Sequence, residues 1–175
     1  MTKTRRITRI AISSVLLFLG AQIALLSEPA FTLTTLSLFI ISSFLDPIDS
    51  LTATLIYLLL GLVGVPVFSH FTAGFGVLFG ISGGFFLAFP IMAYISSHFV
   101  RKFQKSFIPR FTVFFFVTII SYVFEIFWLL ITKSVNVSFG AILTGYILPF
   151  LPFDIIKCAA APFIIEKLQG IIKKW

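Results

Sequence analysis

FTVFFFVTIISYVFEIFWLLI, residues 111–131, is the stretch that decides the class of this protein. A transmembrane helix needs about 20 consecutive, mostly apolar residues to cross the hydrocarbon core of a bilayer. Residues 111–131 meet that length, and Glu125 is the only residue among them with a side chain that is charged at neutral pH in water. The stretch therefore predicts a membrane-spanning helix.

Other apolar runs lie on both sides of this stretch and are also predicted to span the membrane. They are residues 10–26, 33–45, 51–65, 80–99 and 153–170. The run 33–45 is short for a bilayer crossing, which indicates a tilted, bent or shielded helix. Together these runs predict an all-α integral membrane protein, with residues 1–175 forming a single transmembrane domain built as a six-helix bundle.

Residues 138–151 are apolar but end at two prolines, Pro149 and Pro152. Proline interrupts a helix because it lacks a backbone N–H and clashes with the preceding turn. We expect a re-entrant or interfacial piece here, with the upper half of one long kinked helix as the alternative.

The composition excludes a water-soluble domain. The residues are 59% hydrophobic and 11% charged, with 24 Phe among 175 positions. A soluble domain carries about a quarter of its residues as charged side chains. The missing polar surface therefore has to face lipid.

The net charge of +7 is concentrated in three basic segments, residues 1–9, 101–110 and 167–174. Lys and Arg accumulate in the cytoplasmic segments of membrane proteins. Six spans that start from a cytoplasmic N-terminus place all three segments inside and the Gly- and aromatic-rich loop 66–76 outside. We expect a multi-pass protein of the cell (plasma or inner) membrane with both termini in the cytoplasm and no nucleic-acid partner.

Asp154 and Lys157 are the most informative charged residues of the predicted spans, because a charge at membrane depth costs roughly 2.5–3.5 kcal/mol on insertion scales. Residues three apart share one face of a helix. Asp154 also lies at a predicted helix N-terminus, which favours an anion. Two interpretations remain open: a structural ion pair that neutralises itself, or an outer ligand site in which Lys157 binds a carboxylate and Asp154 accepts N–H groups from a small polar ring.

Glu125 lies in the spacing Tyr122-x-x-Glu125-x-x-Trp128, which aligns the three side chains along one stripe of a helix. Its carboxyl either pairs with Lys157, remains protonated within the bundle, or lines the same cavity. His70, in the outer loop, is either incidental or part of that site.

Motifs that carry catalysis are absent from the sequence. Gly140 and Gly145 have the spacing of a P-loop, but Tyr146 follows where lysine is required. The sequence has no pair of histidines at i, i+4 and no G-x-S-x-G elbow. Cys158 is the single cysteine, so an internal disulfide and a cysteine-rich metal site are excluded. We expect no enzymatic activity and no metal site.

Four segments follow one another in an order that is typical of one family. They are FTLTTL (31–36), YLLLGLVGVPVF (57–68), GFGVLFGISGGF (74–85) and LPFLPFDIIK (148–157). In these segments the chain resembles the BioY family, the biotin-specific substrate-binding (S) components of energy-coupling-factor (ECF) transporters. The chain departs from the family's usual pattern at Phe85, where tyrosine is frequent, and at Glu125, where a small residue is frequent.

The resemblance implies a six-helix S component that binds biotin beneath its outer loops, with biotin as transported ligand and no cofactor. It also implies partners: a transmembrane coupling protein, two ATPase subunits and membrane lipid. Asp154 and Lys157 would be ligand residues, and residues 66–84 would form a wall or cap of the site. The further candidate ligand contacts are His70, Gly74, Gly84, Phe85, Tyr122 and Glu125.

The first helices of S components tend to carry small-x-x-x-small spacing for docking on the coupling protein. Ala11-x-x-x-Val15 is an imperfect version of it, and these two residues are the candidate partner interface. The leading hypothesis is a biotin-capturing subunit of an uptake transporter. The alternatives are an S component for another small vitamin and a membrane scaffold protein whose intramembrane charges only pair helices.

Overall fold

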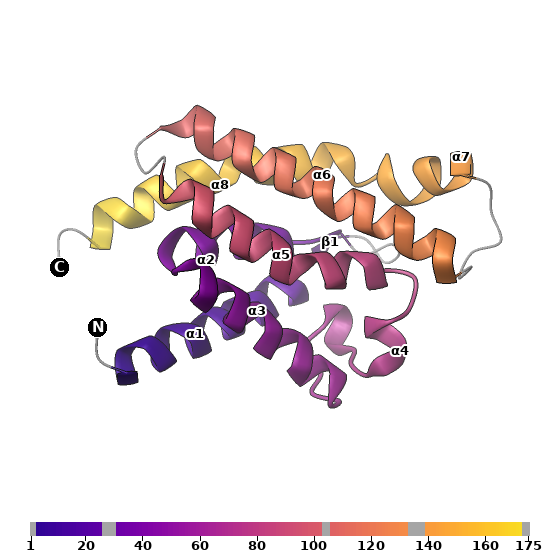
Figure 1. Ribbon diagram of the computed structural model, residues 1–175, viewed down its shortest axis with the longest axis horizontal. Coiled ribbons are helices and arrows are strands. Elements are labelled where there is room, and N and C mark those ends of the chain that lie inside the picture. The colour runs from indigo at the N-terminus through magenta and orange to yellow at the C-terminus, as the bar shows by residue number, and fades with distance from the viewer. Residues whose placement is uncertain (1–2, 26–30, 103–105, 133–138, 173–175) are drawn as a thin grey trace.

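The computed structural model describes residues 3–25, 31–102, 106–132 and 139–172. Long helices dominate these residues (Figure 1), and the all-α prediction is confirmed. The long helices are α1 (Lys3–Gln22), α2 (Thr34–Phe44), α3 (Pro47–Leu62), α5 (Gly83–Val100), α6 (Phe107–Thr132) and α8 (Leu151–Ile172). The shorter elements are η1 (Ser69–Phe71), α4 (Phe75–Leu78), α7 (Phe139–Ile142), η2 (Leu143–Ile147) and the antiparallel strands β1 (Ala24–Leu25) and β2 (Phe31–Thr32).

Two of the described helices, α5 and α6, are long and apolar enough by themselves to cross a membrane. A third span results if the pair Phe139–Ile147 and Leu151–Ile171, bent by 46°, is counted as one. Helices α2 and α3 are apolar but shorter. These lengths support a membrane protein, while the count of six spans stays a prediction.

The bent pair is the segment for which the sequence left two possibilities. Residues 139–147 are helical and lead through a short turn into α8 at an angle of 46°. Because a 46° bend fits a broken span as well as a re-entrant piece, both interpretations of residues 138–151 stand.

Ionic contacts tie α1, α3 and α5 together at one end of the bundle. Arg6 Nη2 lies 2.6 Å from Asp49 Oδ1, and Arg101 forms an ion pair with Asp46. The guanidinium of Arg9 donates to the carbonyl oxygen of Phe44, at the end of α2. Both chain termini also lie at this end, at the left of Figure 1. The described parts of the three basic segments therefore lie at the same end of the bundle, and which side of the membrane this end faces stays a prediction.

The core lies around α5, which packs against α2, α3 and α6, while α8 packs against α2 and α6. Fully buried side chains from four helices fill it: Leu17, Leu38, Met92 and Phe114. Large apolar side chains also cover the outside; Phe116, Phe127 and Phe163 are each 60% exposed or more. An outer surface this apolar suits lipid rather than water.

Candidate functional site

A cavity of about 730 Å³, including the space at its mouth, lies between α1, α2, α3, α5, α6 and α8. Most of its lining residues lie near the ends of their helices that point away from the chain termini. The sequence prediction of a site on the outer side is therefore compatible with the position of this cavity.

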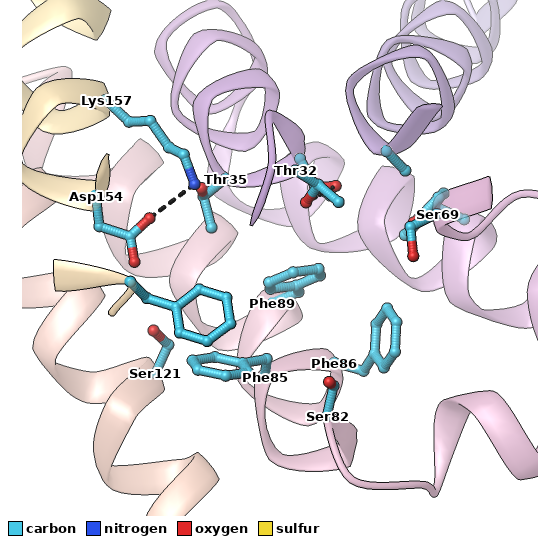
Figure 2. A pocket seen from close by; sticks show the side chains of 14 residues that line it. Thr32, Thr35, Ser69, Ser82, Phe85, Phe86, Phe89, Ser121, Asp154 and Lys157 are labelled. Atoms are coloured by element: carbon cyan, nitrogen blue, oxygen red, sulfur yellow. Dashed lines mark hydrogen bonds and ion pairs between the residues drawn. The ribbon is translucent and has the colours of Figure 1, made fainter. Parts of the chain in front are cut away.

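Aromatic side chains form much of the cavity wall. The rings come from α3, α5 and the turn before α8: Tyr57, Phe85, Phe86, Phe89 and Phe150. Figure 2 shows Phe85, Phe86 and Phe89 projecting from α5 toward the same space. A wall of this kind buries an apolar ring of a ligand and excludes water.

Hydroxyl groups supply most of the remaining polar lining: Thr32, Thr34, Thr35, Ser69, Ser82 and Ser121. Two of these hydroxyl groups differ in their hydrogen bonding. The Ser121 hydroxyl donates to the carbonyl oxygen of Thr118 at 2.7 Å. The buried Thr35 hydroxyl has no hydrogen-bond partner among the described residues.

Among the described residues that line this cavity, Asp154 and Lys157 carry the only charged groups. Lys157 Nζ lies 2.8 Å from Asp154 Oδ1, and each side chain is 11% exposed (Figure 2). The hydroxyl of Tyr122 donates to Asp154 Oδ2 at 2.5 Å. Each carboxylate oxygen thus accepts one hydrogen bond, and the Lys157 ammonium, which has three donors, makes one bond among the described residues, to Asp154. The ion pair predicted from the sequence exists, and its cation retains capacity for an anion.

The structure places Tyr122 and Glu125 behind the cavity wall, not among the lining residues. Tyr122 acts on the site through Asp154. Glu125, only 1% exposed, accepts a hydrogen bond of 3.0 Å from the backbone N–H of Phe85, in the first turn of α5. It forms no ion pair with Lys157, whose ammonium is bound by Asp154. The carboxyl group instead meets the N-terminal end of α5, where it accepts a backbone hydrogen bond.

The remaining predicted site residues, Gly84, His70 and Gly74, do not line the cavity. Gly84 does not line the cavity; its backbone packs so closely on α6 that an added Cβ would overlap Glu125 Cα. His70 is exposed, and Gly74 has a φ of 98° with open space around it. Neither is among the residues that line the cavity, whereas Ser69, next to His70, is.

The two candidate docking residues are exposed on α1: Ala11, and Val15 with 54% of its surface accessible. Their position leaves them open to a partner, and their role stays a prediction.

The sequence did not identify the cavity hydroxyls or Gln22. Serine and threonine within apolar helices commonly bond to their own helix, so their presence does not distinguish a cavity wall from a helix interior. Gln22, at the end of α1, contacts a segment far along the chain: its Nε2 lies 2.8 Å from the carbonyl oxygen of Phe68. No local sequence pattern predicts such a partner.

The sequence matches a known family and several of its members. A sequence profile described as the BioY family matches residues 1–174. The chain is 32% identical over 157 residues to the biotin transporter BioY2 of Lactococcus lactis subsp. cremoris, covering 89% of this chain and 85% of that protein. It is 30% identical over 171 residues to the probable biotin transporter BioY of Pyrococcus horikoshii, covering 96% of this chain and 98% of that protein.

The fold also matches a solved structure. The crystal structure of the S-component for biotin from an ECF-type ABC transporter superposes with a TM-score of 0.83, covering 97% of this chain and 95% of that chain at 21% identity. At that identity the match establishes the fold, and the sequence matches establish the lineage. The resemblance found in the sequence is thereby confirmed, and the chain belongs to the BioY family.

Proposed function

We propose that this chain is the substrate-binding membrane subunit for biotin uptake, which captures the vitamin from the outer side and delivers it inward with an ATP-driven module. The observation that carries the proposal is the buried pair Asp154 and Lys157, whose ammonium keeps donors free in an aromatic cavity. The relatives named above are biotin transporters or probable ones, which supports biotin as the ligand.

The cavity offers a partner for each chemical group of biotin. The carboxylate tail matches the Lys157 ammonium, and the apolar thiophane ring matches the phenylalanine wall. The ureido group, with two N–H donors and one carbonyl, matches hydroxyls such as that of Thr35, which has no partner among the described residues. A buried polar group of the ligand that found no partner would cost about 1–3 kcal/mol.

Energy for transport has to come from other subunits, because the sequence lacks a P-loop at its only matching glycine spacing. We propose a transmembrane coupling protein and two ATPase subunits as these partners. The exposed side of α1 around Ala11 and Val15 is the proposed docking site. The fold match to the S-component of an ECF-type ABC transporter supports this assembly.

The test is equilibrium binding of labelled biotin to the purified protein in lipid nanodiscs. Lys157→Met should weaken binding by about tenfold or more, because a hydrogen bond to a charged group contributes about 1.5–3 kcal/mol. Asp154→Asn should weaken it by about tenfold as well, since the ammonium loses its fixed neighbour. Lys167→Met, at an exposed position of the same helix, is the matched control and should bind as wild type does.

Binding of biotin methyl ester distinguishes loss of the contact to the biotin carboxylate from a general disturbance of the protein by the substitution. If Lys157 binds the carboxylate, biotin methyl ester should bind wild type and Lys157→Met almost equally. Wild-type affinity for biotin in both Asp154→Asn and Lys157→Met would remove the proposed site.

The two alternative functions predict other outcomes. An S component for another vitamin would be stabilised against heat by thiamine or riboflavin and not by biotin. A scaffold protein would be stabilised by none of the three.

A further inference from the structure

Gln22 links the end of α1 to the segment that follows α3. Its side-chain Nε2 donates to the carbonyl oxygen of Phe68 at 2.8 Å and approaches that of Val67 at 3.4 Å. Its Oε1 accepts the backbone N–H of Phe71 at 3.1 Å. One amide side chain therefore bonds to the backbone on both sides of Ser69, which lines the cavity (Figure 2).

The turn that Gln22 holds has a strained backbone. His70 and Phe71 have φ angles of 55° and 56°, in the left-handed region that residues with a Cβ disfavour. Such residues persist only where their surroundings over-determine the conformation, and they are frequent at ligand clamps. The strain here falls directly after Ser69, the residue that the turn brings to the cavity.

Packing holds the turn on one side only. Phe68 is fully buried, and its ring contacts those of Tyr57 and Phe86 at centroid distances of 5.6 Å and 4.6 Å. Phe71 is 65% exposed and meets the ring of Phe18 edge-on at 6.3 Å. Hydrogen bonds of Thr72 also close the turn: the Phe68 N–H donates to the carbonyl oxygen of Thr72 at 3.0 Å, and the Thr72 N–H and hydroxyl donate to that of Ser69 at 3.2 Å and 2.8 Å. The hydrogen bond from the Phe71 N–H to Gln22 is thus a polar contact that ties this closed turn to α1.

We propose that Gln22 is a positioning residue of the ligand site. Its amide holds the strained turn Ser69–Phe71 against the cavity, and so keeps the Ser69 hydroxyl on the bound ligand and slows ligand release. The inference rests on the proposed function, because it assigns Gln22 a role in the same site. Loss of the amide removes the hydrogen bonds that tie the turn to α1, and the strain of the two left-handed residues then favours movement of Ser69 away from the cavity.

The first measurement is the dissociation rate of labelled biotin from the protein in nanodiscs. Gln22→Met preserves the length of the side chain and removes its hydrogen bonds; we expect the rate to rise about fivefold or more, since changes within one site act mostly on dissociation. Ile23→Met introduces the same residue at the neighbouring, 53% exposed position and should leave the rate unchanged. Gln22→Glu, which keeps the acceptor for Phe71 and loses the donor, is a second variant and should raise the rate as well.

Two combinations distinguish positioning from general support of the fold. In a Ser69→Ala background, Gln22→Met should add less than about a twofold change, because the group it positions is gone. His70→Gly relieves the left-handed strain and should recover much of the wild-type rate in the Gln22→Met protein. Equal effects of Gln22→Met with and without Ser69, or an unchanged rate in Gln22→Met and Gln22→Glu, would overturn the inference.

Hydrogen exchange without ligand separates this inference from the proposed function. The Phe71 amide should exchange faster in Gln22→Met than in wild type or Ile23→Met. If wild type bound no biotin, the proposed function would fail, while faster exchange would still support the structural role of Gln22. If wild type bound biotin and exchange at Phe71 were unchanged in Gln22→Met, the inference alone would fail.

Discussion

Tyr122 stands behind the cavity and reaches it through Asp154, to which its hydroxyl donates at 2.5 Å. Glu125 and Gln22 act similarly on Phe85 and on the turn at Ser69 through backbone N–H groups. These residues touch the wall from outside the cavity. Their substitution therefore changes the shape and polarity of the site without removing a group from its surface.

Tyr122→Phe should lower biotin affinity about three- to tenfold, because one buried oxygen of Asp154 loses its donor and Asp154 is then held less firmly beside Lys157. Binding of labelled biotin in nanodiscs measures the effect. Tyr94→Phe is the control, since Tyr94 is 40% exposed and its ring stacks on His98. Equal affinities for the Tyr122→Phe and Tyr94→Phe proteins would contradict the role assigned to the Tyr122 hydroxyl.

Glu125→Leu should destabilise the protein by about 1–3 kcal/mol, because the buried N–H of Phe85 then has no acceptor. Glu125→Gln keeps a carbonyl oxygen at the same place and should retain most of the stability. Thermal unfolding in detergent, followed by tryptophan fluorescence, compares them. If glutamine and leucine lowered the midpoint equally, the charge of Glu125, rather than its hydrogen bond, would be what stabilises α5.

At the scale of elements, the contact between α5 and α6 depends on small residues. A Cβ on Gly84 would overlap the α6 backbone at Phe124 and Glu125, and one on Gly83 would meet the indole of Trp128. Small residues let membrane helices approach closely. In lipid, van der Waals packing and hydrogen bonds, rather than the hydrophobic effect, stabilise such helix contacts. The same approach allows Glu125 to reach the first turn of α5.

Gly84→Ala should destabilise the protein by about 1–3 kcal/mol and weaken biotin binding, because α5 has to move away from α6 and takes Phe85 with it. Gly145→Ala is the matched substitution in η2, where an added Cβ meets nothing within 4 Å. We expect that variant to unfold at the wild-type temperature or slightly above it. A similar loss of stability in both would show that the α5–α6 contact is not the cause.

The long helices were predictable from the sequence because apolar runs of sufficient length have few alternatives. Residues 111–131 lie within α6, and residues 33–45 correspond closely to α2. The start of α6 at Phe107 was not predicted, because the helix continues into the basic segment, where hydropathy no longer marks it. The short elements β1, β2 and η1 were missed since their form depends on contacts between distant segments.

The charged part of the site was also predictable, and its polar remainder was not. Asp154 and Lys157 stand out because ionisable groups are rare and costly in apolar helices. Which face of α2 or α5 borders the cavity depends on how the helices pack. The sequence alone therefore could not identify Thr35 and Ser82 as cavity-lining residues. Gln22 binds a carbonyl 46 residues away, a pairing that only the folded chain displays.

At the scale of the whole molecule, the two ends of the bundle differ in charge. Arg6, Arg9 and Arg101 gather at the end that holds both termini, and they bind Asp46, Asp49 and the end of α2. The described lining of the cavity has a single cation, Lys157, which is paired with Asp154. Since basic segments accumulate in the cytoplasm, this asymmetry predicts a cavity that faces the outside.

Cysteine labelling in intact cells tests that orientation. Cys158 is fully buried, so Cys158→Ala provides the background for single cysteines at Gly76 and Ser106, both exposed in the structure. A maleimide that cannot cross membranes should label Gly76→Cys, where open space surrounds the Cβ position, and should label Ser106→Cys only after the membrane is permeabilised. Labelling of Ser106→Cys in intact cells would show that the bundle has the opposite orientation in the membrane. An inverted bundle would turn the cavity toward the cytoplasm, where it could not capture a vitamin from the medium, so this experiment tests the direction of uptake independently of any measurement of biotin binding.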